Sequence, residues 1–377
     1  MTPRWATAGV FFVNGMGVGT LLPHIPWLQD RLDLSKGVIG LCLLAMTAGA
    51  LIAMPVTGQV LERRPSRLVV LVAVIAFPVA LAFPLLAPSA VALAVLLFAV
   101  GLANGIFDVA QNAHGSAVER AMGRPIMSSL HAGWSLGGVV GAAGAALAAA
   151  AGLDARVYVA LAAGVLLVLG LAFWSRIGDT GEVVASEGGG LTRPSRDVLL
   201  LGVLCILVMV TEGAMNDWSP LYLRETLGAG QDVAAAGFAT FSAGMALGRI
   251  FGDALVARLG RDLVLRGGAA LAVVALAGLL LAESISVALM GLALVGLGVA
   301  NGVPLMFSAA GRLENPGAAI AAVSTMGYVA FLGGPPLLGF LADATSLPTA
   351  LATVCLAAGT VVVLGGRVSR REAPVAV

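Results

Sequence analysis

The fold is decided by a polar stretch inside an otherwise apolar region of the chain, Gly101-Leu102-Ala103-Asn104-Gly105-Ile106-Phe107-Asp108-Val109-Ala110-Gln111-Asn112-Ala113-His114. Asn104, Asp108 and the pair Gln111 and Asn112 follow at i, i+4 and i+7 or i+8, so one face of a single helix carries them all. If this helix crosses a bilayer, its carboxylate is costly and has to face the bundle interior or a water-filled cavity. Asp108 is therefore a functional-site hypothesis.

The composition is typical of a membrane protein. Of the 377 residues, 59% are hydrophobic, 11% are charged and 50 are glycine, whereas about 25% of residues are charged in soluble domains. The formal net charge of +1 supplies no basic face for nucleic acid, which is excluded as a partner. The three cysteines lie in apolar segments without metal-ligand spacing, so we expect neither a metal site nor a cofactor.

Apolar runs of about 20 residues, long enough to cross the hydrocarbon core, recur between short charged or proline-containing breaks. We predict twelve transmembrane helices, at 5–28, 37–61, 67–87, 89–113, 126–151, 155–175, 197–223, 233–257, 263–283, 285–309, 317–342 and 347–367. The longest polar break, 176–196, contains three consecutive glycines and is interpreted as a cytoplasmic linker. The predicted fold class is an all-α membrane protein with two six-helix halves, 1–175 and 197–377.

The basic residues set the expected orientation. Most of the 21 Lys and Arg residues fall in the termini and in loops on the same side as the N-terminus. The positive-inside rule then places both termini in the cytoplasm. We expect a multi-pass protein of the bacterial inner membrane.

The two halves share a short sequence pattern. The fourth predicted helix contains Val100-Gly101-Leu102-Ala103-Asn104-Gly105, and the tenth contains Val295-Gly296-Leu297-Gly298-Val299-Ala300-Asn301-Gly302, with a two-residue insertion. Such a match is expected of parallel six-helix repeats, which in transporters place a substrate site near mid-membrane. Asp108 has no acidic counterpart in the tenth helix, where Pro304 and Leu305 occur instead. The repeat indicates a transporter and singles out Asp108.

Two loops carry a recognisable motif. The loop after the eighth predicted helix follows Gly248-Arg249-Ile250-Phe251-Gly252-Asp253 and contains Arg258-Leu259-Gly260-Arg261, and the second helix ends in Gly58-Gln59-Val60-Leu61-Glu62-Arg63-Arg64. These segments resemble the loop signature of the major facilitator superfamily, with Glu62 in place of the usual Asp. Residues 108–114, 124–131, 212–219 and 333–336 also resemble the YbjJ-like bacterial permeases, relatives of the fucose permease group. The resemblance covers nearly the whole chain.

The resemblance implies that helices 1, 4, 7 and 10 line a central cavity, where Asn14, Asp108, Glu212 and Asn301 would converge. We interpret eight polar or aromatic residues as substrate-binding: Asn14, Asn104, Gln111, Asn112, Trp134, Asn216, Asn301 and Tyr328. For each asparagine, the alternative is a structural hydrogen bond to a neighbouring helix.

Proton coupling is assigned to Asp108, Glu212 and His131. A carboxylate in a low-dielectric cavity takes up a proton on one side and releases it on the other when the cavity reorients. His131 is expected at a similar depth on the neighbouring helix, which predicts an Asp108–His131 pair. The alternative is that Asp108 only anchors the fourth helix to the fifth or belongs to the inner gate.

Gating is assigned to charged and aromatic residues at the helix ends. The inner set is Glu62, Arg63, Arg249, Asp253 and Arg258, and the outer set is His24, Trp27, Asp217 and Trp218. A carboxylate at a helix end can pair with arginines and helix N-termini and hold one side closed. The alternative is that these are ordinary interfacial charges. His114 is interpreted as a solvated helix end.

The predicted function is secondary active transport of a small polar solute by alternating access, coupled to protons. The resemblance to the fucose permease group implies a sugar or sugar-derived solute. No catalytic triad, phosphate loop or metal cluster is visible in the sequence, so we do not expect an enzyme. The expected partners are the solute, protons and the lipid bilayer, with the protein a monomer. The alternatives are proton-driven efflux of a hydrophobic compound and a non-transporting receptor with a transporter fold.

Overall fold

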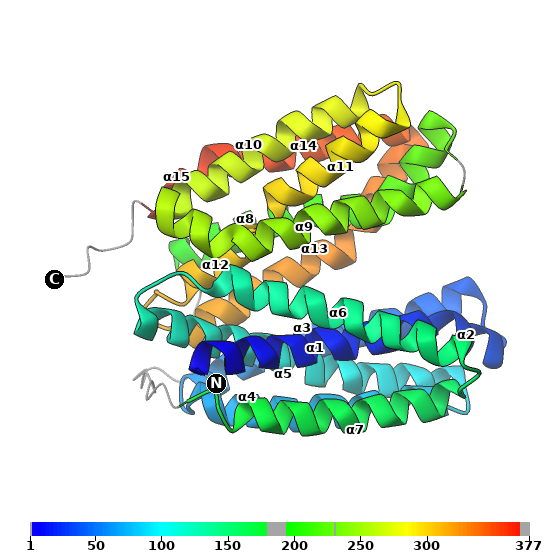
Figure 1. The fold of residues 1–377 in the computed structure, drawn as a ribbon, viewed down its shortest axis with the longest axis vertical. Coiled ribbons are helices and arrows are strands. Elements are labelled where there is room, and N and C mark those ends of the chain that lie inside the picture. The colour runs from blue at the N-terminus through cyan, green and yellow to red at the C-terminus, as the bar shows by residue number, and fades with distance from the viewer. Residues whose placement is uncertain (1, 179–193, 230, 370–377) are drawn as a thin grey trace. The chain divides into compact units, whose positions relative to one another are not determined.

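The computed structural model describes residues 2–178, 194–229 and 231–369, and these residues form helices joined by short turns, with no strand among them (Figure 1). The helices before the linker are α1 Pro3–Leu21, α2 Ile25–Arg31, α3 Lys36–Leu61, α4 Ser66–Leu81, α5 Ala90–Met122, α6 Met127–Ala150 and α7 Ala155–Trp174. Two 3-10 turns, η1 Leu22–His24 and η2 Pro84–Leu86, lie among them. The helices after the linker are α8 Arg196–Leu227, α9 Gln231–Leu259, α10 Arg261–Leu280, α11 Ile285–Val299, α12 Gly302–Ala310, α13 Pro316–Ala344, α14 Leu347–Leu364 and α15 Gly366–Ser369.

The predicted all-α membrane fold is confirmed. Within the described residues, eleven helical stretches are long and apolar enough to cross a membrane. The remaining expected span, 233–257, coincides with α9, a helix of 29 residues. Most of the predicted linker, 176–196, lies outside the described residues.

The first expected helix, 5–28, is interrupted. α1 ends at Leu21, η1 forms one tight turn, and α2 continues to Arg31. Pro23 and Pro26 have no amide N–H to donate to the preceding turn, so a continuous ladder of α-helical hydrogen bonds cannot pass through them.

The fourth expected helix, 89–113, is longer than predicted. α5 continues to Met122, because Glu119 and Arg120, which looked like the start of a loop, are good helix formers. Gly123 ends α5 with a φ of 62°, a left-handed conformation that suits glycine. His114 is therefore not a solvated helix end, as predicted, but a buried residue inside α5 with 1% of its surface exposed.

The tenth expected helix, 285–309, is divided at Ala300 and Asn301 into α11 and α12. Pro304 explains the division, because a proline supplies no N–H for the carbonyl four residues earlier, that of Ala300. In the fourth expected helix Phe107 stands at the corresponding place, and α5 is continuous. The two repeats therefore differ in backbone as well as in side chains.

The chain divides into two compact units. Unit 1 contains the described residues up to Ile126, those from Leu130 to the linker, and 313–325. Unit 2 contains 127–129, 194–312 and the residues from Met326 onward. The start of α13 thus belongs to unit 1 and the first turn of α6 to unit 2. The predicted halves 1–175 and 197–377 remain a prediction, and the units differ from them by these two short segments.

Glycines let the helices of unit 1 approach closely. A Cβ atom on Gly15 of α1 would lie 1.9 Å from the carbonyl oxygen of Trp134 in α6, and one on Gly137 of α6 would lie 2.1 Å from that of Phe12. Both distances are shorter than any stable contact, so only glycine fits at either position. The close α1–α6 packing brings polar side chains of the two helices within hydrogen-bonding distance.

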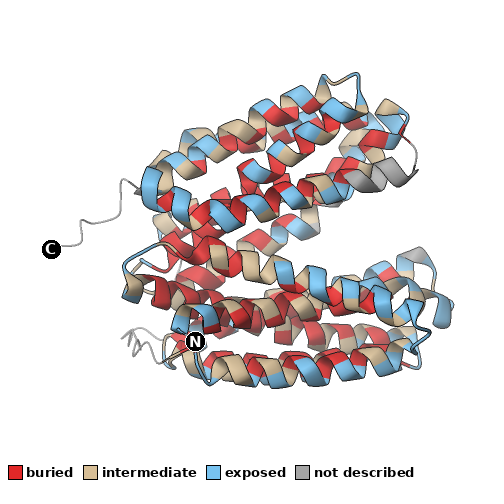
Figure 2. Ribbon diagram, viewed as in Figure 1, coloured by how far each residue is buried: buried red, intermediate tan, exposed pale blue. Residues whose placement is uncertain are grey.

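The outer surfaces of the helices are apolar. On α7, an exposed stripe at helical spacing consists of Val157, Leu161, Val165, Val168 and Leu171. Figure 2 shows exposed residues along this helix, and its buried positions, such as Leu166, lie on the other face. An apolar exposed face on a helix of 20 residues is what contact with lipid requires.

Candidate functional site

Four of the predicted substrate-binding side chains form one hydrogen-bonded cluster in unit 1. Asn14 of α1 donates through Nδ2 to Asn104 Oδ1 at 2.9 Å. Its Oδ1 accepts from Trp134 Nε1 of α6 at 2.9 Å and from Gln111 Nε2 at 3.3 Å. We call Asn14, Asn104, Gln111 and Trp134 the amide cluster. It joins α1, α5 and α6 and has Asn14 as its hub.

The amide cluster contains one buried hydrogen-bond acceptor without a donor in the described part of the chain, the side-chain oxygen of Gln111. Gln111 is 2% exposed, and its Oε1 atom accepts no hydrogen bond from the described residues. A buried acceptor without a donor is uncommon, because leaving it unsatisfied costs about 1–3 kcal/mol. Such an acceptor suits a hydroxyl or amide donor of a small polar ligand.

Asp108 lies one turn along α5 from Asn104 and is partly buried. Its Oδ2 accepts from Ser324 Oγ of α13 at 2.9 Å, and its Oδ1 accepts from Asn112 Nδ2 at 3.3 Å. Ser324 belongs to the segment of α13 that is part of unit 1. Asp108 thus connects α5 to the start of α13 through a buried serine hydroxyl.

The predicted Asp108–His131 pair is not formed in this structure. The hydrogen bonds of the Asp108 carboxylate go to Ser324 and Asn112, and the ring of His131 packs against Phe11 with centroids 5.3 Å apart. The depth argument counted residues along two helices but could not say which way each side chain turns. The roles assigned to Asp108 and His131 stay predictions.

Glu212 and Arg249, predicted for different roles, form a buried ion pair in unit 2. Arg249 Nη2 of α9 lies 3.5 Å from Glu212 Oε1 of α8. The side chain of Arg249 is 7% exposed and that of Glu212 is 15% exposed. The gating role predicted for Arg249 and the coupling role predicted for Glu212 stay predictions.

The division between α11 and α12 supplies a second partner for Arg249. Its Nε donates to the carbonyl oxygen of Ala300 at 3.3 Å, the same carbonyl that Pro304 cannot satisfy. Asn301 is also bound to α9, since its Nδ2 donates to the Gly248 carbonyl at 3.0 Å. A Cβ atom on Gly252 would lie 1.9 Å from Asn301 Oδ1, so the motif glycine makes room for this contact. Asn301 therefore has the structural role that was the alternative for each asparagine, and its predicted substrate role is untested.

Asp253, the motif aspartate, lies at the first turn of α6 within unit 2. Its Oδ1 accepts from the backbone N–H groups of Ser128 at 3.0 Å and Ser129 at 3.3 Å. In unit 1, Glu119 Oε2 accepts from the backbone N–H of Ile126 at 2.9 Å. These N–H groups have no partner inside α6, and a carboxylate near a helix N-terminus is stabilised by the positive end of the helix dipole.

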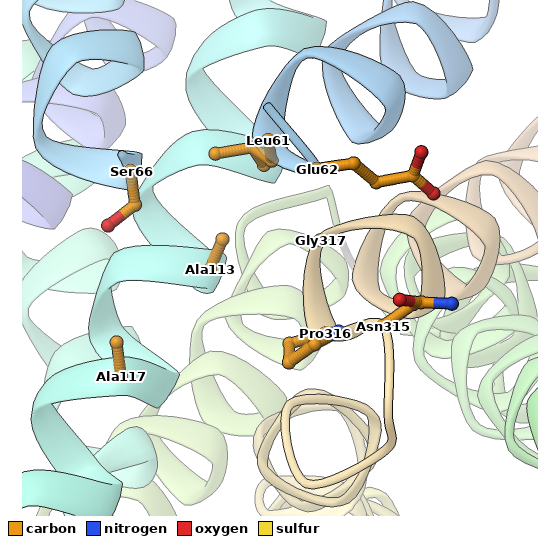
Figure 3. A pocket seen from close by; sticks show the side chains of 8 residues that line it. All are labelled: Leu61, Glu62, Ser66, Ala113, Ala117, Asn315, Pro316 and Gly317. Carbon is orange, nitrogen blue, oxygen red and sulfur yellow. The ribbon is translucent and has the colours of Figure 1, made fainter. Parts of the chain in front are cut away.

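Glu62, the counterpart of Asp253, lines a recess at the end of α3 (Figure 3). The recess has an empty volume of about 430 Å³, part of it open to solvent, and is lined by Leu61, Glu62, Ser66, Ala113, Ala117, Asn315, Pro316 and Gly317. Glu62 and Asn315 lie on one side, with Ser66 and the two alanines on the other. Ser66 Oγ is 2.9 Å from Nδ1 of the buried His114. The recess thus lies where the start of α13 meets α3, α4 and α5.

The predicted outer-gate residues His24 and Trp27 lie in a cluster of rings and cations in unit 1. His24 is buried and stacks on Tyr158 with centroids 5.6 Å apart. Trp27 has the guanidinium carbons of Arg31 and Arg156 at 5.3 and 5.8 Å from its ring centroid. The backbone and side-chain N–H groups of Arg156 donate to Asp154 and hold the pKa of that carboxyl below its usual value.

The remaining predicted residues differ in their exposure. Asn216, Trp218 and Tyr328 are partly buried, and Arg63, Asp217 and Arg258 are exposed. Sequence reasoning missed Ser324, although a Ser-Thr pair in the apolar run 317–342 was a usable signal. Among the described residues, no group of three or more His, Cys, Asp or Glu side chains could hold a metal ion.

Among the described residues, eleven candidate spans and α9 make up the predicted twelve helices, and charged and amide side chains are buried inside each unit. These features are typical of a membrane transporter. The sequence matches the model of the Major Facilitator Superfamily over residues 7–335. The chain therefore belongs to the Major Facilitator Superfamily.

Relatives of similar length agree with this assignment. An uncharacterized transporter of Sinorhizobium fredii is 36% identical over 369 residues, which cover 97% of this chain and 97% of the relative. An uncharacterized MFS-type transporter of Yersinia pestis is 34% identical over 369 residues, with 97% and 95% covered.

Solved structures share the fold. The E. coli fucose:proton symporter FucP superimposes with a TM-score of 0.79 at 16% identity and covers 97% of this chain and 98% of its own. A bacterial homologue of the iron transporter ferroportin, in an outward-facing state, gives a TM-score of 0.82 at 15% identity, with 98% and 100% covered. At these identities the likeness concerns the fold alone.

Proposed function

We propose that this protein is a proton-coupled secondary active transporter of a small polar solute. The observation that carries the proposal is Asp108, a partly buried carboxylate on a membrane-spanning helix, hydrogen-bonded to Ser324 and one turn from the amide cluster. Placing a carboxylate in a transmembrane segment costs free energy, so the presence of Asp108 there indicates a functional role. Proton uptake and release by Asp108 is the use that fits a transporter.

The amide cluster is proposed to contact the solute. Amide groups donate and accept neutral hydrogen bonds, and Trp134 adds an aromatic face, which together suit a solute with hydroxyl groups. The uncommitted Gln111 acceptor is available to such a solute. The structural neighbour FucP is a fucose:proton symporter, which agrees with this solute class without establishing it.

Asp253 and Glu62 are proposed as inner-gate residues. Asp253 binds the first turn of α6, and Glu62 lies beside the first turn of α13. α6 and α13 occupy equivalent places in the two repeats. The two carboxylates therefore lie at the N-terminal ends of equivalent helices. Making and breaking these contacts would bias an equilibrium between two conformations.

We further propose a monomer in the bacterial inner membrane with both termini in the cytoplasm.

The test is solute-driven proton flux in proteoliposomes that contain a pH-sensitive dye. Sugars, polyols and organic acids are first screened by thermal stabilisation of the purified protein, and the stabilising compounds are then added to the liposomes. We expect internal acidification with the wild type. Asp108→Asn should lower the proton flux at least about tenfold, the change that about 1.4 kcal/mol produces.

Asp343→Asn is the matched control, since it makes the same chemical change at an exposed position near the end of α13. It should behave as the wild type. Unaltered proton flux and pH dependence in Asp108→Asn would contradict the coupling role. Export of hydrophobic compounds without flux of any polar solute would favour efflux, and binding without flux would favour a receptor.

A further inference from the structure

We propose that the side chains of Asp108, Asn112 and Ser324 bind a sodium ion inside unit 1. The inference rests on the proposed transport function and deepens it, because it adds a second cation that occupies the coupling carboxylate in place of a proton. Asp108 and Asn112 lie on α5, and Ser324 lies on the segment of α13 that belongs to the same unit. The ion would bind next to the amide cluster, whose proposed ligand is the solute.

The carboxylate of Asp108 has no cationic partner among the residues that the structure describes. Its oxygens accept hydrogen bonds from Ser324 Oγ at 2.9 Å and from Asn112 Nδ2 at 3.3 Å, and no Lys, Arg or His side chain forms an ion pair with it. Glu212 on α8, by contrast, has Arg249 at 3.5 Å. A carboxylate inside a membrane-spanning helix needs a proton or a bound cation to balance its charge.

Asn112 supplies a second, independent observation. Its Nδ2 donates to the backbone carbonyl of Asp108 at 2.9 Å as well as to the carboxylate. These two bonds determine which end of the amide carries the oxygen, because the reversed amide would place Oδ1 against two acceptors. Asn112 is 0% exposed, and no donor in the described ranges reaches its Oδ1 atom. A buried amide oxygen without a donor is uncommon and indicates a partner from outside the chain.

One cation can contact all three side chains. The C=O and C–N bonds of an amide are about 1.2 and 1.3 Å long, so Asn112 Oδ1 lies within about 6 Å of the carboxylate oxygen that its Nδ2 binds. Oxygen ligands lie about 2.3–2.6 Å from a hard cation, and therefore up to about 5 Å from one another. A small side-chain rotation brings these oxygens around one ion. Ser324 Oγ, whose proton is donated to Asp108 Oδ2, keeps its lone pairs for the same ion.

These ligands select a hard, monovalent cation. Carboxylate, amide and hydroxyl oxygens suit hard cations, whereas softer metals prefer the sulfur and imidazole ligands that these three side chains lack. A single carboxylate balances one positive charge, so a divalent ion would leave a net charge inside the membrane. K⁺ is larger and needs more oxygens than three side chains provide. Na⁺ fits both requirements, with water or a solute hydroxyl completing its coordination.

The sodium ion and the proton are then alternative occupants of Asp108. Either one neutralises the carboxylate, whereas a water molecule bound to Asn112 Oδ1 leaves the negative charge unbalanced. Because both ions bind the same group, each weakens binding of the other. A sodium gradient is thus expected to drive the same transport cycle as a proton gradient.

The test measures sodium binding to the purified protein in nanodiscs, with potassium chloride and choline chloride at equal ionic strength as references. Binding of radioactive sodium gives the affinity, and thermal unfolding gives the stabilisation. We expect sodium chloride to raise the unfolding temperature above that in either reference salt, because an ion that binds only the folded state stabilises it. Asp108→Asn should remove this difference. Asp343→Asn, the same change at an exposed position of α13, should retain it.

The two neutral ligands are tested one at a time. Asn112→Ala and Ser324→Ala each remove one oxygen and should weaken sodium binding about tenfold or more, whereas Asn315→Ala at the recess should not change it. Ser324→Cys replaces the hard oxygen by a soft sulfur of similar size and should also weaken binding, which separates loss of the ligand from loss of packing. Unfolding in potassium chloride shows which variants are folded. If Asn112→Ala is not, Ser324→Cys and Asp108→Asn decide the matter.

The inference is overturned if sodium and potassium stabilise the wild type equally, or if Asp108→Asn or Ser324→Cys binds sodium as the wild type does. Solute-driven proton flux that persists in sodium-free proteoliposomes, together with no sodium binding, would overturn it and leave the proposed transport function intact. Sodium binding that depends on Asp108, without flux of any solute under a sodium or a proton gradient, would support the site and contradict the transport function.

Discussion

Asn14 is the residue on which the amide cluster depends. Asn14→Ala would remove three hydrogen bonds. Nδ2 of Asn14 would no longer donate to Asn104, and its Oδ1 would no longer accept from Gln111 and Trp134. Unsatisfied buried polar groups cost about 1–3 kcal/mol each, so we expect the free energy of unfolding to fall by about 2–4 kcal/mol. Thermal unfolding in detergent measures the change.

Asn315→Ala is the control for Asn14→Ala. Asn315 is a partly exposed amide at the recess, so its removal should change the unfolding temperature little. Equal, small effects of the two substitutions would mean that the hydrogen bonds of Asn14 are replaced by water and that the cluster does not hold α1 to α5 and α6.

The sequence indicated which residues are polar on apolar faces, but not which of them meet. Asp108 was identified from spacing on one helix, and that reasoning requires only the period of the helix. Its partner Ser324 is 216 positions away along the chain, and such a contact follows from tertiary packing. The contacts of Arg249 could not be predicted for the same reason, because its neighbours in sequence form a loop motif while its neighbours in space include Glu212 and Ala300.

At the scale of helices, the glycines of α1 and α6 set the distance between the two backbones. Gly15→Ala would bring a Cβ atom to 1.9 Å from the Trp134 carbonyl, which the rigid backbone cannot accommodate. We expect it to destabilise the protein by more than about 2 kcal/mol, because overpacking here separates two helices. The same substitution would also stretch the Trp134–Asn14 hydrogen bond.

Gly164→Ala on α7 provides the comparison, since no atom lies within 4 Å of the added Cβ. Alanine is preferred over glycine inside a helix by about 0.5–1 kcal/mol, so this variant should be as stable as the wild type or slightly more stable. Unfolding temperatures of the two variants in the same detergent decide the matter. Similar values would mean that α1 and α6 are not packed through Gly15.

Helix boundaries were predicted least well where local chemistry competed with hydropathy. Hydropathy ended the fourth helix at 113, yet α5 continues to Met122 because helix propensity does not end at a charged residue. It also joined 285–309 into one helix, although Pro304 interrupts the hydrogen-bond ladder. Both signals were present in the sequence and were outweighed by the regularity of the apolar runs.

At the scale of the molecule, twelve apolar runs and a repeated motif were sufficient to predict the fold and the family. The repeat could not foretell that 127–129 and 313–325 each pack with the unit built mainly from the other part of the chain. These segments begin α6 and α13, and their contacts include two backbone N–H groups of α6 and the hydroxyl of Ser324 in α13, which have no distinctive sequence signature. Asp253 accepts hydrogen bonds from the first turn of α6, and Glu62 lies beside the first turn of α13.

From the contact between Asp253 and α6 we predict an effect on the equilibrium between the two transport conformations. Asp253→Ala removes the acceptor of the Ser128 and Ser129 N–H groups and the negative charge at the positive end of α6. We expect faster hydrogen exchange in the first turn of α6 and a population shift between the two transport conformations, by about 1–2 kcal/mol for a charge-assisted hydrogen bond. Hydrogen exchange read by mass spectrometry on peptides covering residues 126–132 measures the local effect, and solute-driven flux in proteoliposomes measures the global one.

Asp343→Asn, remote from α6 in sequence and exposed, should change neither. Faster exchange with unchanged flux would show that Asp253 only caps a helix, whereas a change in both would assign it to the gate.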